Sequence, residues 1–245
     1  MAIVKRVFWR MQHERSQRIT HDEIPAFADP AVASAFLRFN QYLTEKTSTR
    51  LEPLYRLRLL EIDRVIRRYR VKYIREMGSG RTTFFFNLFR DLDVISYEQD
   101  ERWREVLLAF YAESGLSLPR IVFSSAENYK DGGRFASLAS GPCDLLYIDG
   151  PYVRRDLGKL PTHTGKPAYY DFERILENGL PKVIMVEGRT DTVDAILASP
   201  LAREYNFKGE LTWALERGRY LHALGLRRHS IFIRKSPKAG LPHAV

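Results

Sequence analysis

The sequence predicts an α/β fold built on a mostly parallel sheet, with a helical extension at its N-terminal end. Three observations predict this fold class. Apolar residues recur at helical spacing in the first 70 residues, short apolar runs alternate with amphipathic ones from Lys72 onward, and two late apolar runs follow each other with no obvious helix between them. A strand followed by a helix, repeated, is the pattern of βαβ units, whose strands lie parallel. The two late runs indicate an antiparallel pair at a sheet edge.

The helical extension is predicted over residues 1–70. One helix starts at Asp29-Pro30, because proline is tolerated at the start of a helix and apolar residues then recur every three or four positions. A second helix starts near residue 48, and its apolar positions form a single stripe that runs to Tyr69. We expect this extension to cap the site, to mediate dimerisation or to pack on the sheet.

The α/β domain is predicted over residues 71–235, and residues 236–245, with two prolines and a glycine, predict a frayed tail. The expected strands are Tyr73–Glu76, Val94–Glu98, Arg120–Ser124, Leu145–Asp149, Val183–Glu187, Glu210–Glu216 and Ser230–Arg234. The expected helices are Thr82–Leu92, Glu101–Ser114, Gly133–Ala139 and Tyr169–Glu177.

The charge balance of the chain narrows the choice of partners. The formal net charge is +9, from 39 lysines and arginines against 30 acidic residues. A basic balance suits a nucleic acid, an anionic membrane surface or an anionic small substrate. Cations crowd residues 50–75, which fits either a solvated helix face or a functional basic surface.

Cysteine content and hydropathy indicate a cytoplasmic protein. Cys143 is the only cysteine, so no disulfide forms within the chain, and a reducing compartment fits. No apolar run approaches the roughly 18 residues that would span a bilayer. Residues 1–12 lack the continuous apolar segment of a secretory signal.

The first predicted strand runs into a glycine turn, Glu76-Met77-Gly78-Ser79-Gly80, and a helix follows. Glycines permit a tight turn and a close approach of the backbone to a ligand. The third glycine of the dinucleotide fingerprint is replaced by Thr83, so a nicotinamide dinucleotide fits less well. A strand-to-helix turn without a ligand gives the same pattern, and the turn alone leaves both interpretations open.

Glu98 ends the second predicted strand, 18 positions after Gly80. A carboxylate about 20 residues after such a turn accepts hydrogen bonds from ribose hydroxyls in nucleotide-binding folds. A solvated glutamate at a strand end is the simpler alternative. Because the turn and the carboxylate occur together at this spacing, the sequence favours a ligand that bridges two strand ends.

Four segments resemble the motifs of class I S-adenosylmethionine-dependent methyltransferases. The turn at residues 76–80 and the segment Tyr97-Glu98-Gln99-Asp100 resemble the first two motifs of that family, residues 145–151 its fourth-strand motif and residues 183–187 its fifth strand. The resemblance covers roughly residues 60–234. It implies a Rossmann-like sheet of seven strands whose last strand is antiparallel.

The same resemblance implies S-adenosylmethionine as the cofactor. Glu76 is expected to hold the turn or to reach the cofactor's amino group through a water, Glu98 to bind the ribose, and Asp149 to lie beside the methyl group. The residues expected at the cofactor are Glu76, Gly78, Ser79, Gly80, Glu98, Gln99, Ala126, Glu127 and Asp149, with Ala126 and Glu127 at the adenine.

A long polar stretch after the fourth strand, residues 152–170, is the candidate acceptor pocket, although an ordinary surface loop fits as well. Its basic residues suit an anionic or sugar-like small molecule. A general base helps the reaction if the acceptor is a hydroxyl, and Asp149, His163 and Glu187 are the candidates. A structural cap is the alternative role for Asp149, and an exposed loop position is the alternative for His163.

Two more detailed resemblances compete at this site. Asp149-Gly150-Pro151-Tyr152 is similar to the Asp-Pro-Pro-Tyr motif of nucleic-acid amino-methyltransferases but departs from it at Gly150. The path from Asp149 to Glu187 is similar to the metal-dependent catechol-type O-methyltransferases, which have Asp-Asn where this chain has Glu187-Gly188. A hard cation needs several oxygen ligands, so a divalent metal stays unassigned.

The sequence therefore predicts a methyltransferase that acts on a small molecule, at an oxygen of a saccharide or natural product. A nucleic-acid methyltransferase is the alternative that the net charge supports. A non-catalytic protein that keeps the domain as a binding module is the alternative from another class. A nicotinamide-dependent oxidoreductase is disfavoured by Thr83.

Overall fold

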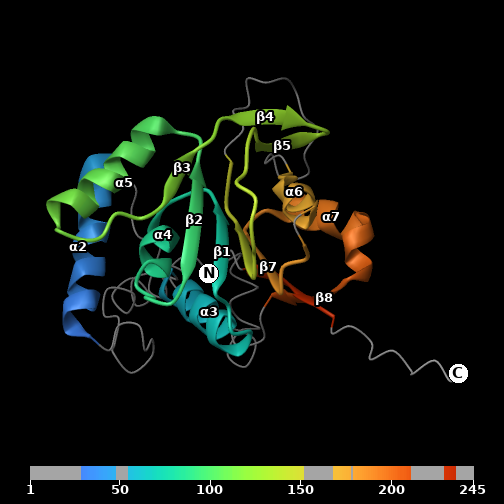
Figure 1. Ribbon diagram of the computed structural model, residues 1–245, viewed down its shortest axis with the longest axis horizontal. Coiled ribbons are helices and arrows are strands. Elements are labelled where there is room, and N and C mark those ends of the chain that lie inside the picture. The colour runs from blue at the N-terminus through green and yellow to red at the C-terminus, as the bar shows by residue number, and fades with distance from the viewer. Residues whose placement is uncertain (1–28, 48–54, 152–167, 178, 211–228, 236–245) are drawn as a thin grey trace, which may run out of the picture.

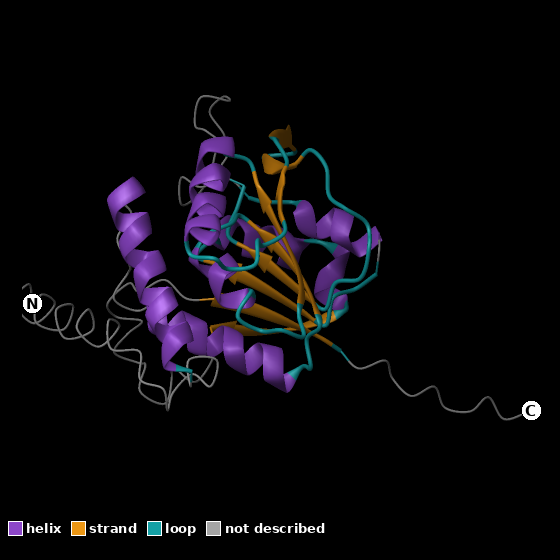
Figure 2. Cartoon of the chain, turned by 60° about the vertical axis from the view of Figure 1, so that its left-hand side comes forward, coloured by secondary structure: helices purple, strands orange, loops and turns teal. Residues whose placement is uncertain are grey.

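The computed structural model describes residues 29–47, 55–151, 168–177, 179–210 and 229–235. Within these ranges a twisted sheet forms the centre of the molecule, and helices cover both of its faces (Figures 1 and 2). No described helix is both long and apolar enough to cross a membrane.

Seven strands form the sheet, in the order β3-β2-β1-β6-β7-β9-β8. The strands are β1 (Tyr73–Met77), β2 (Asp93–Glu98), β3 (Ile121–Phe123), β6 (Leu145–Ile148), β7 (Val183–Glu187), β8 (Tyr205–Glu210) and β9 (His229–Arg234). Strand β9 is antiparallel to both of its neighbours, and the pairs among β3, β2, β1, β6 and β7 are parallel. The predicted seven-stranded, mostly parallel sheet with an antiparallel last strand is confirmed.

The strand order reverses beside β1. The chain runs outward from β1 through β2 to β3, and then returns to place β6 on the other side of β1. In open α/β sheets of this kind, ligands bind at the carboxyl ends of the strands, where the order switches. The carboxyl ends of β1, β2 and β6 therefore mark the place where a ligand is expected.

The described helices are α2 (Pro30–Thr47), α3 (Tyr55–Arg68), α4 (Arg81–Phe86), α5 (Glu101–Glu113), α6 (Asp171–Glu177) and α7 (Thr190–Ala198), with a 3₁₀ turn η2 at Pro200–Arg203. Helix α4 is shorter than predicted, because the Asn87 side chain bonds to the Thr83 carbonyl (2.7 Å) and helps to end it. Helix α7 was not predicted. Strand β8 precedes the run Glu210–Glu216 that was expected to form it, and residues 211–216 lie outside the described residues.

The helix predicted over Gly133–Ala139 is wrong. Its first residues form β5 (Gly132–Phe135), which pairs with β4 (Ala126–Tyr129) in a separate two-stranded sheet. The Gly133 N–H bonds to the Ala168 carbonyl at 2.9 Å, and a Cβ atom at Gly132 would lie 1.9 Å from that oxygen. Close backbone contact with a distant segment, which only glycine permits here, overrides the apolar spacing that suggested a helix.

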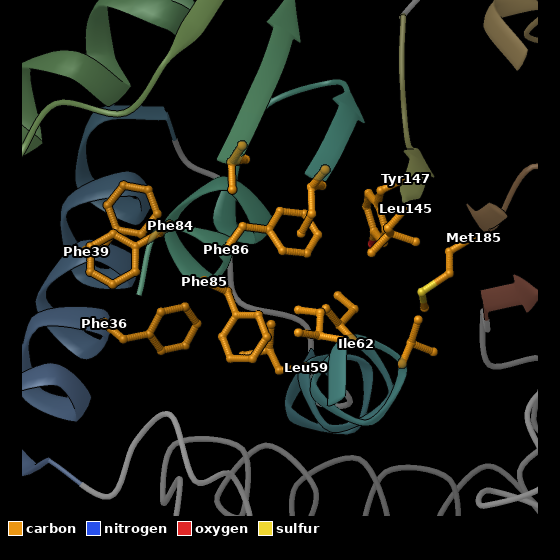
Figure 3. Close-up of a cluster of buried hydrophobic side chains, with 14 of the residues drawn as sticks. Phe36, Phe39, Leu59, Ile62, Phe84, Phe85, Phe86, Leu145, Tyr147 and Met185 are labelled. Atoms are coloured by element: carbon orange, nitrogen blue, oxygen red, sulfur yellow. The ribbon is translucent and has the colours of Figure 1, made fainter. Parts of the chain in front are cut away.

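Two apolar cores lie on the two faces of the sheet. One contains side chains of α2 and α3 together with those of α4, α5 and the strands, so the predicted extension shares the core of the α/β unit. Figure 3 shows Phe36 and Phe39 of α2 facing Phe84 of α4. The Phe39 and Phe84 rings are stacked, with their centroids 4.7 Å apart. The side chains of α6 and α7 close the other face.

Candidate functional site

The turn after β1 meets the turn after β6 through bare backbone. The Gly78 N–H bonds to the Tyr97 carbonyl (3.0 Å), and the N–H groups of Asp149 and Gly150 bond to the Met77 carbonyl. A Cβ atom on Gly78 would lie 2.8 Å from the Gly150 nitrogen, and the φ angle of Gly78 is +93°. Glycine at position 78 is therefore required by the packing of one strand end on another.

Gly80 has a different environment. A Cβ atom added at this residue would meet no described atom within 4 Å. Its N–H bonds to the Thr83 hydroxyl (2.8 Å), which fixes the first turn of α4. The open side of the glycine turn thus lies at Gly80, and this is the position where a ligand has room to approach the backbone.

The Glu98 carboxylate joins the ends of β1 and β2. One oxygen accepts hydrogen bonds from the Ser79 N–H (3.1 Å) and the Ser79 hydroxyl (2.7 Å). The other accepts from the N–H groups of Gln99 and Asp100, each at 2.9 Å. The sequence features that were expected to act together are thus in direct contact. A carboxylate has about four lone-pair sites, so a further donor would take the place of a present one, and the rotatable Ser79 hydroxyl is the easiest to displace.

The first turn of helix α5 holds the glycine turn in position. Asp100 caps the helix by accepting hydrogen bonds from the N–H groups of Arg102 (3.0 Å) and Trp103 (3.2 Å). The Trp103 indole N–H then donates to the Ser79 carbonyl at 2.9 Å. The turn is consequently held in place before any ligand binds.

Glu76 is buried beside the first turn of α4. Its carboxylate is fully buried and accepts hydrogen bonds from the hydroxyls of Thr82, Thr83 and Ser96. Burial raises the pKa of Glu76 to about 7, against the lowering effect of these three hydroxyls. Of the two roles expected for Glu76, this geometry fits the one that holds the turn.

Asp149 follows β6 and faces Arg189, which follows β7. The Arg189 guanidinium donates to the Asp149 carbonyl and, at 3.2 Å, to its carboxylate. The Asp149 side chain remains 45% exposed, whereas that of Arg189 is 6% exposed. Desolvation by the strand ends around it and the nearby charge of Glu187 raise the pKa of Asp149 to about 7, although Arg189 opposes this rise. A carboxylate that is accessible and titrates near neutral pH suits a general base.

Glu187 lies in a buried charge network made of Arg58, Glu61, Tyr147, Glu187 and His229. Arg58 and the Tyr147 hydroxyl donate to Glu187. His229 contacts Glu61 through Nδ1 (2.8 Å) and the Tyr147 oxygen through Nε2 (2.9 Å). Every member is at most 8% exposed. The network ties α3 to the ends of β6, β7 and β9.

Within this network the pKa of Glu187 is lowered and the pKa of His229 is raised. Burial alone would raise the pKa of Glu187, but His229, Arg58 and Tyr147 together lower it to about 2. Burial alone would lower the pKa of His229, but Glu187 and Glu61 raise it to about 9. Glu187 is therefore a permanently ionised partner of two cations, and this environment does not favour a role as general base.

The remaining expected site residues are less central. Glu127 is in β4, and its carboxylate pairs with Arg134 (2.6 Å) and Arg174 (3.1 Å). Ala126 begins the same strand and is half-buried. His163 lies outside the described residues, as does most of the expected acceptor stretch.

Sequence reasoning missed Arg189 as a site residue. Its guanidinium also contacts the Tyr169 hydroxyl at 3.4 Å and lies over the Tyr169 ring, 5.0 Å from its centroid. The signal available in the sequence was a single basic residue two positions after the predicted fifth strand. Among the residues that the structure describes, no cluster of three or more His, Cys, Asp and Glu side chains offers a metal site.

No protein-family model and no curated protein matches the chain. Its fold is similar to that of the SAH-bound methyltransferase PaMTH1 from Podospora anserina, with 12% identity over 85% of this chain and 89% of that one and a TM-score of 0.48. A methyltransferase from Pyrococcus furiosus has 15% identity over 83% of this chain and 98% of that one, with a TM-score of 0.46. The O-methyltransferase TomG from Streptomyces achromogenes, in complex with SAM, has 13% identity over 82% and 90%, with a TM-score of 0.42. These likenesses concern the fold alone.

Proposed function

We propose that this chain is a class I S-adenosylmethionine-dependent methyltransferase whose cofactor lies across the carboxyl ends of β1 and β2. The observation that carries the proposal is the contact between Glu98 and Ser79 at the switch in strand order. The glycine turn and the carboxylate that ends β2 meet there, as a nucleoside ligand that bridges two strand ends requires.

The residues of the turn fit such a cofactor. The open side of the turn at Gly80 gives the methionine part room beside the backbone. A ribose hydroxyl would donate to Glu98 in place of the Ser79 hydroxyl, while the three backbone N–H groups keep the carboxylate oriented. This exchange costs little, because one hydroxyl donor replaces another.

Bound S-adenosylmethionine supplies an electrophilic methyl group on a positively charged sulfur. The chain has to place an acceptor oxygen in line with that methyl and to remove its proton. Asp149 is the residue we assign to this proton, since part of its carboxylate is accessible and its pKa is raised to about 7. Arg189 keeps the Asp149 carboxylate oriented from the side of β7.

The acceptor in this proposal is a small molecule that is methylated at oxygen, such as a saccharide or a natural product. Support comes from the accessible Asp149 carboxylate, which the buried Arg189 guanidinium holds at the ends of β6 and β7. A carboxylate suits a hydroxylated acceptor, because it accepts a hydrogen bond from a hydroxyl group.

Calorimetry with S-adenosylmethionine and its demethylated product tests the cofactor assignment. We expect both to bind to the wild type, and we expect Gly80→Val to abolish binding with little change in melting temperature. Ala112→Val on the exposed face of α5 is the matched control and should bind as the wild type does. Heat from neither nucleoside with the wild type would instead favour the non-catalytic binding module.

A further inference from the structure

Six basic side chains line the edge of the sheet opposite the proposed cofactor site. They stand at or next to the strand ends where β1, β7 and β8 begin and the antiparallel β9 finishes. We call this row the basic edge, and its members are Arg70, Lys72, Lys182, Arg203, Arg234 and Lys235. All six are exposed.

Direct contacts show that the basic edge is continuous. Lys182 donates to the Arg70 carbonyl and pairs with Asp144, each at 3.1 Å. The same Asp144 carboxylate accepts the Lys72 N–H (2.8 Å). The Arg234 N–H bonds to the Lys182 carbonyl (2.9 Å).

The far end of the row is held in the same way. The Lys235 ammonium donates to the Arg203 carbonyl at 2.6 Å, and the Arg234 guanidinium donates to the Leu180 carbonyl at 3.1 Å. A carbonyl holds a cation in position without adding a negative charge beside it, whereas a carboxylate offsets the positive charge. Of the six cations, only Lys182 pairs with a carboxylate among the described residues.

Few acidic groups interrupt the row. Asp144 and Glu204 lie within it, and Asp93 bounds it beyond β1, where its N–H bonds to the Lys72 carbonyl (2.8 Å). Six cations against these three carboxylates leave a clear positive excess on one edge. Part of the positive charge of the chain is thus concentrated at the basic edge, and only Arg70 and Lys72 of this edge belong to the basic segment seen in the sequence.

The spacing of the basic edge suits a phosphate backbone. It crosses five adjacent strands, β1, β6, β7, β9 and β8, and therefore extends about 19 Å at roughly 4.8 Å per strand. One strand of a nucleic-acid duplex presents a phosphate about every 3.4 Å of helix axis, or between five and six over that length. A row of six cations, of which Lys182, Arg234 and Lys235 are held by hydrogen bonds to carbonyls, matches this charge density.

The scarcity of exposed apolar side chains at the basic edge argues against two other polyanions, a single-stranded nucleic acid and an anionic membrane surface. The large exposed apolar residues of the described chain are Leu37, Leu116, Leu118, Phe123, Leu197 and Phe207. Phe207 lies in β8, two residues beyond its start, and is the single exposed aromatic ring among the described residues of the strands that carry the basic edge. Binding of single strands relies on exposed aromatic rings that stack on bases, and interfacial membrane binding relies on apolar side chains that enter the lipid.

We propose that the basic edge binds the phosphate backbone of a double-stranded nucleic acid without reading its sequence. The site is separate from the proposed cofactor site, because Lys72 and Gly78 lie at opposite ends of β1, about 20 Å apart at about 3.3 Å per residue. It would hold the protein on a polyanion while the other edge of the sheet stays accessible. The proposal does not depend on methyl transfer.

Fluorescence anisotropy with a labelled 20-base-pair duplex tests the proposal on the full chain. We expect micromolar binding at low salt, with the logarithm of the affinity falling by about 4 for each tenfold rise in salt, as four or five phosphate contacts require. The triple variant Lys72→Gln, Arg203→Gln, Lys235→Gln should lower that slope by about three and weaken binding at least 10-fold. Excess S-adenosylhomocysteine should leave the duplex affinity unchanged.

The matched control removes three exposed cations from α2 and α5 by Arg38→Gln, Lys46→Gln and Arg102→Gln. This control lowers the net charge by the same amount but leaves the basic edge intact, so it should lose less than 3-fold in affinity. Equal losses in the two triple variants would overturn the proposal, and so would the absence of duplex binding. Tighter binding to single-stranded DNA of the same length, or to phosphatidylserine-containing vesicles, would also overturn it.

Discussion

Replacing Arg58 by methionine should destabilise the protein because it leaves the buried Glu187 carboxylate without the guanidinium that pairs with it directly. The side chains of Arg58 and Glu187 are each 9% exposed, and removing one partner of a buried ion pair costs about 3–5 kcal/mol. His229 and Tyr147 continue to stabilise Glu187, so we expect a loss near the lower limit, about 3 kcal/mol. For a chain of this length that corresponds to a fall in Tm of roughly 6–12 °C.

Urea unfolding of a double-mutant cycle measures this effect. In Arg58→Met, Glu187→Gln the remaining charges, His229 and Glu61, balance each other again. The double variant should therefore be at least about 2 kcal/mol more stable than the sum of the two single losses predicts. Arg68→Met, an exposed position on the same helix, is the control and should change the free energy of unfolding by no more than about 0.5 kcal/mol.

Additive losses in the cycle would refute this reasoning, because they would mean that Arg58 and Glu187 do not interact. A loss in Arg58→Met no larger than that in Arg68→Met would refute it as well. Either result would also exclude Arg58 as a cause of the low pKa of Glu187.

Three further predictions concern pH and the strand ends. The pKa of His229 is raised from 6.5 to about 9. The stability that its charge contributes is therefore complete below pH 6.5 and is lost as the pH rises to about 9. Urea unfolding at several pH values should show this fall in the wild type, and His229→Gln should flatten it. Gly78→Ala should cost about 1–3 kcal/mol, because its Cβ atom would meet the Gly150 nitrogen at a positive φ angle, whereas Gly80→Ala should melt as the wild type does. Asp149→Asn should abolish turnover but keep cofactor affinity within about 3-fold. Wild-type turnover should rise with pH up to about 7, as the base loses its proton. Unchanged turnover in Asp149→Asn would exclude Asp149 as the base.

Much of the sheet could be predicted because its strands have local signatures. The runs around Tyr73, Val94, Leu145 and Val183 are apolar and short, and each forms a strand close to the predicted bounds. The predictions failed where a distant contact decides the local conformation. The residues after Gly132 pair with β4 and touch Ala168, and nothing in their own spacing reveals either partner.

In the candidate site, too, some features could be predicted from nearby residues and others depend on distant contacts. The glycine turn and Glu98 were predictable, since strand ends, glycines and a carboxylate at a fixed spacing are all visible along the chain. Their detailed roles were not. Gly78 packs on Gly150 and Gly80 faces open space, a difference that depends on which strand lies beside β1.

The sequence by itself determined the alternation of strands and helices, the turn between β1 and α4, and the carboxylate that closes it, because each depends on residues near one another in the chain. Only the tertiary structure decided that Arg58 meets Glu187 across 129 positions, that Arg189 faces Asp149, and that six scattered cations form one basic edge. The order of strands in the sheet brings these residues together, and pairing between distant segments follows from packing of the whole chain.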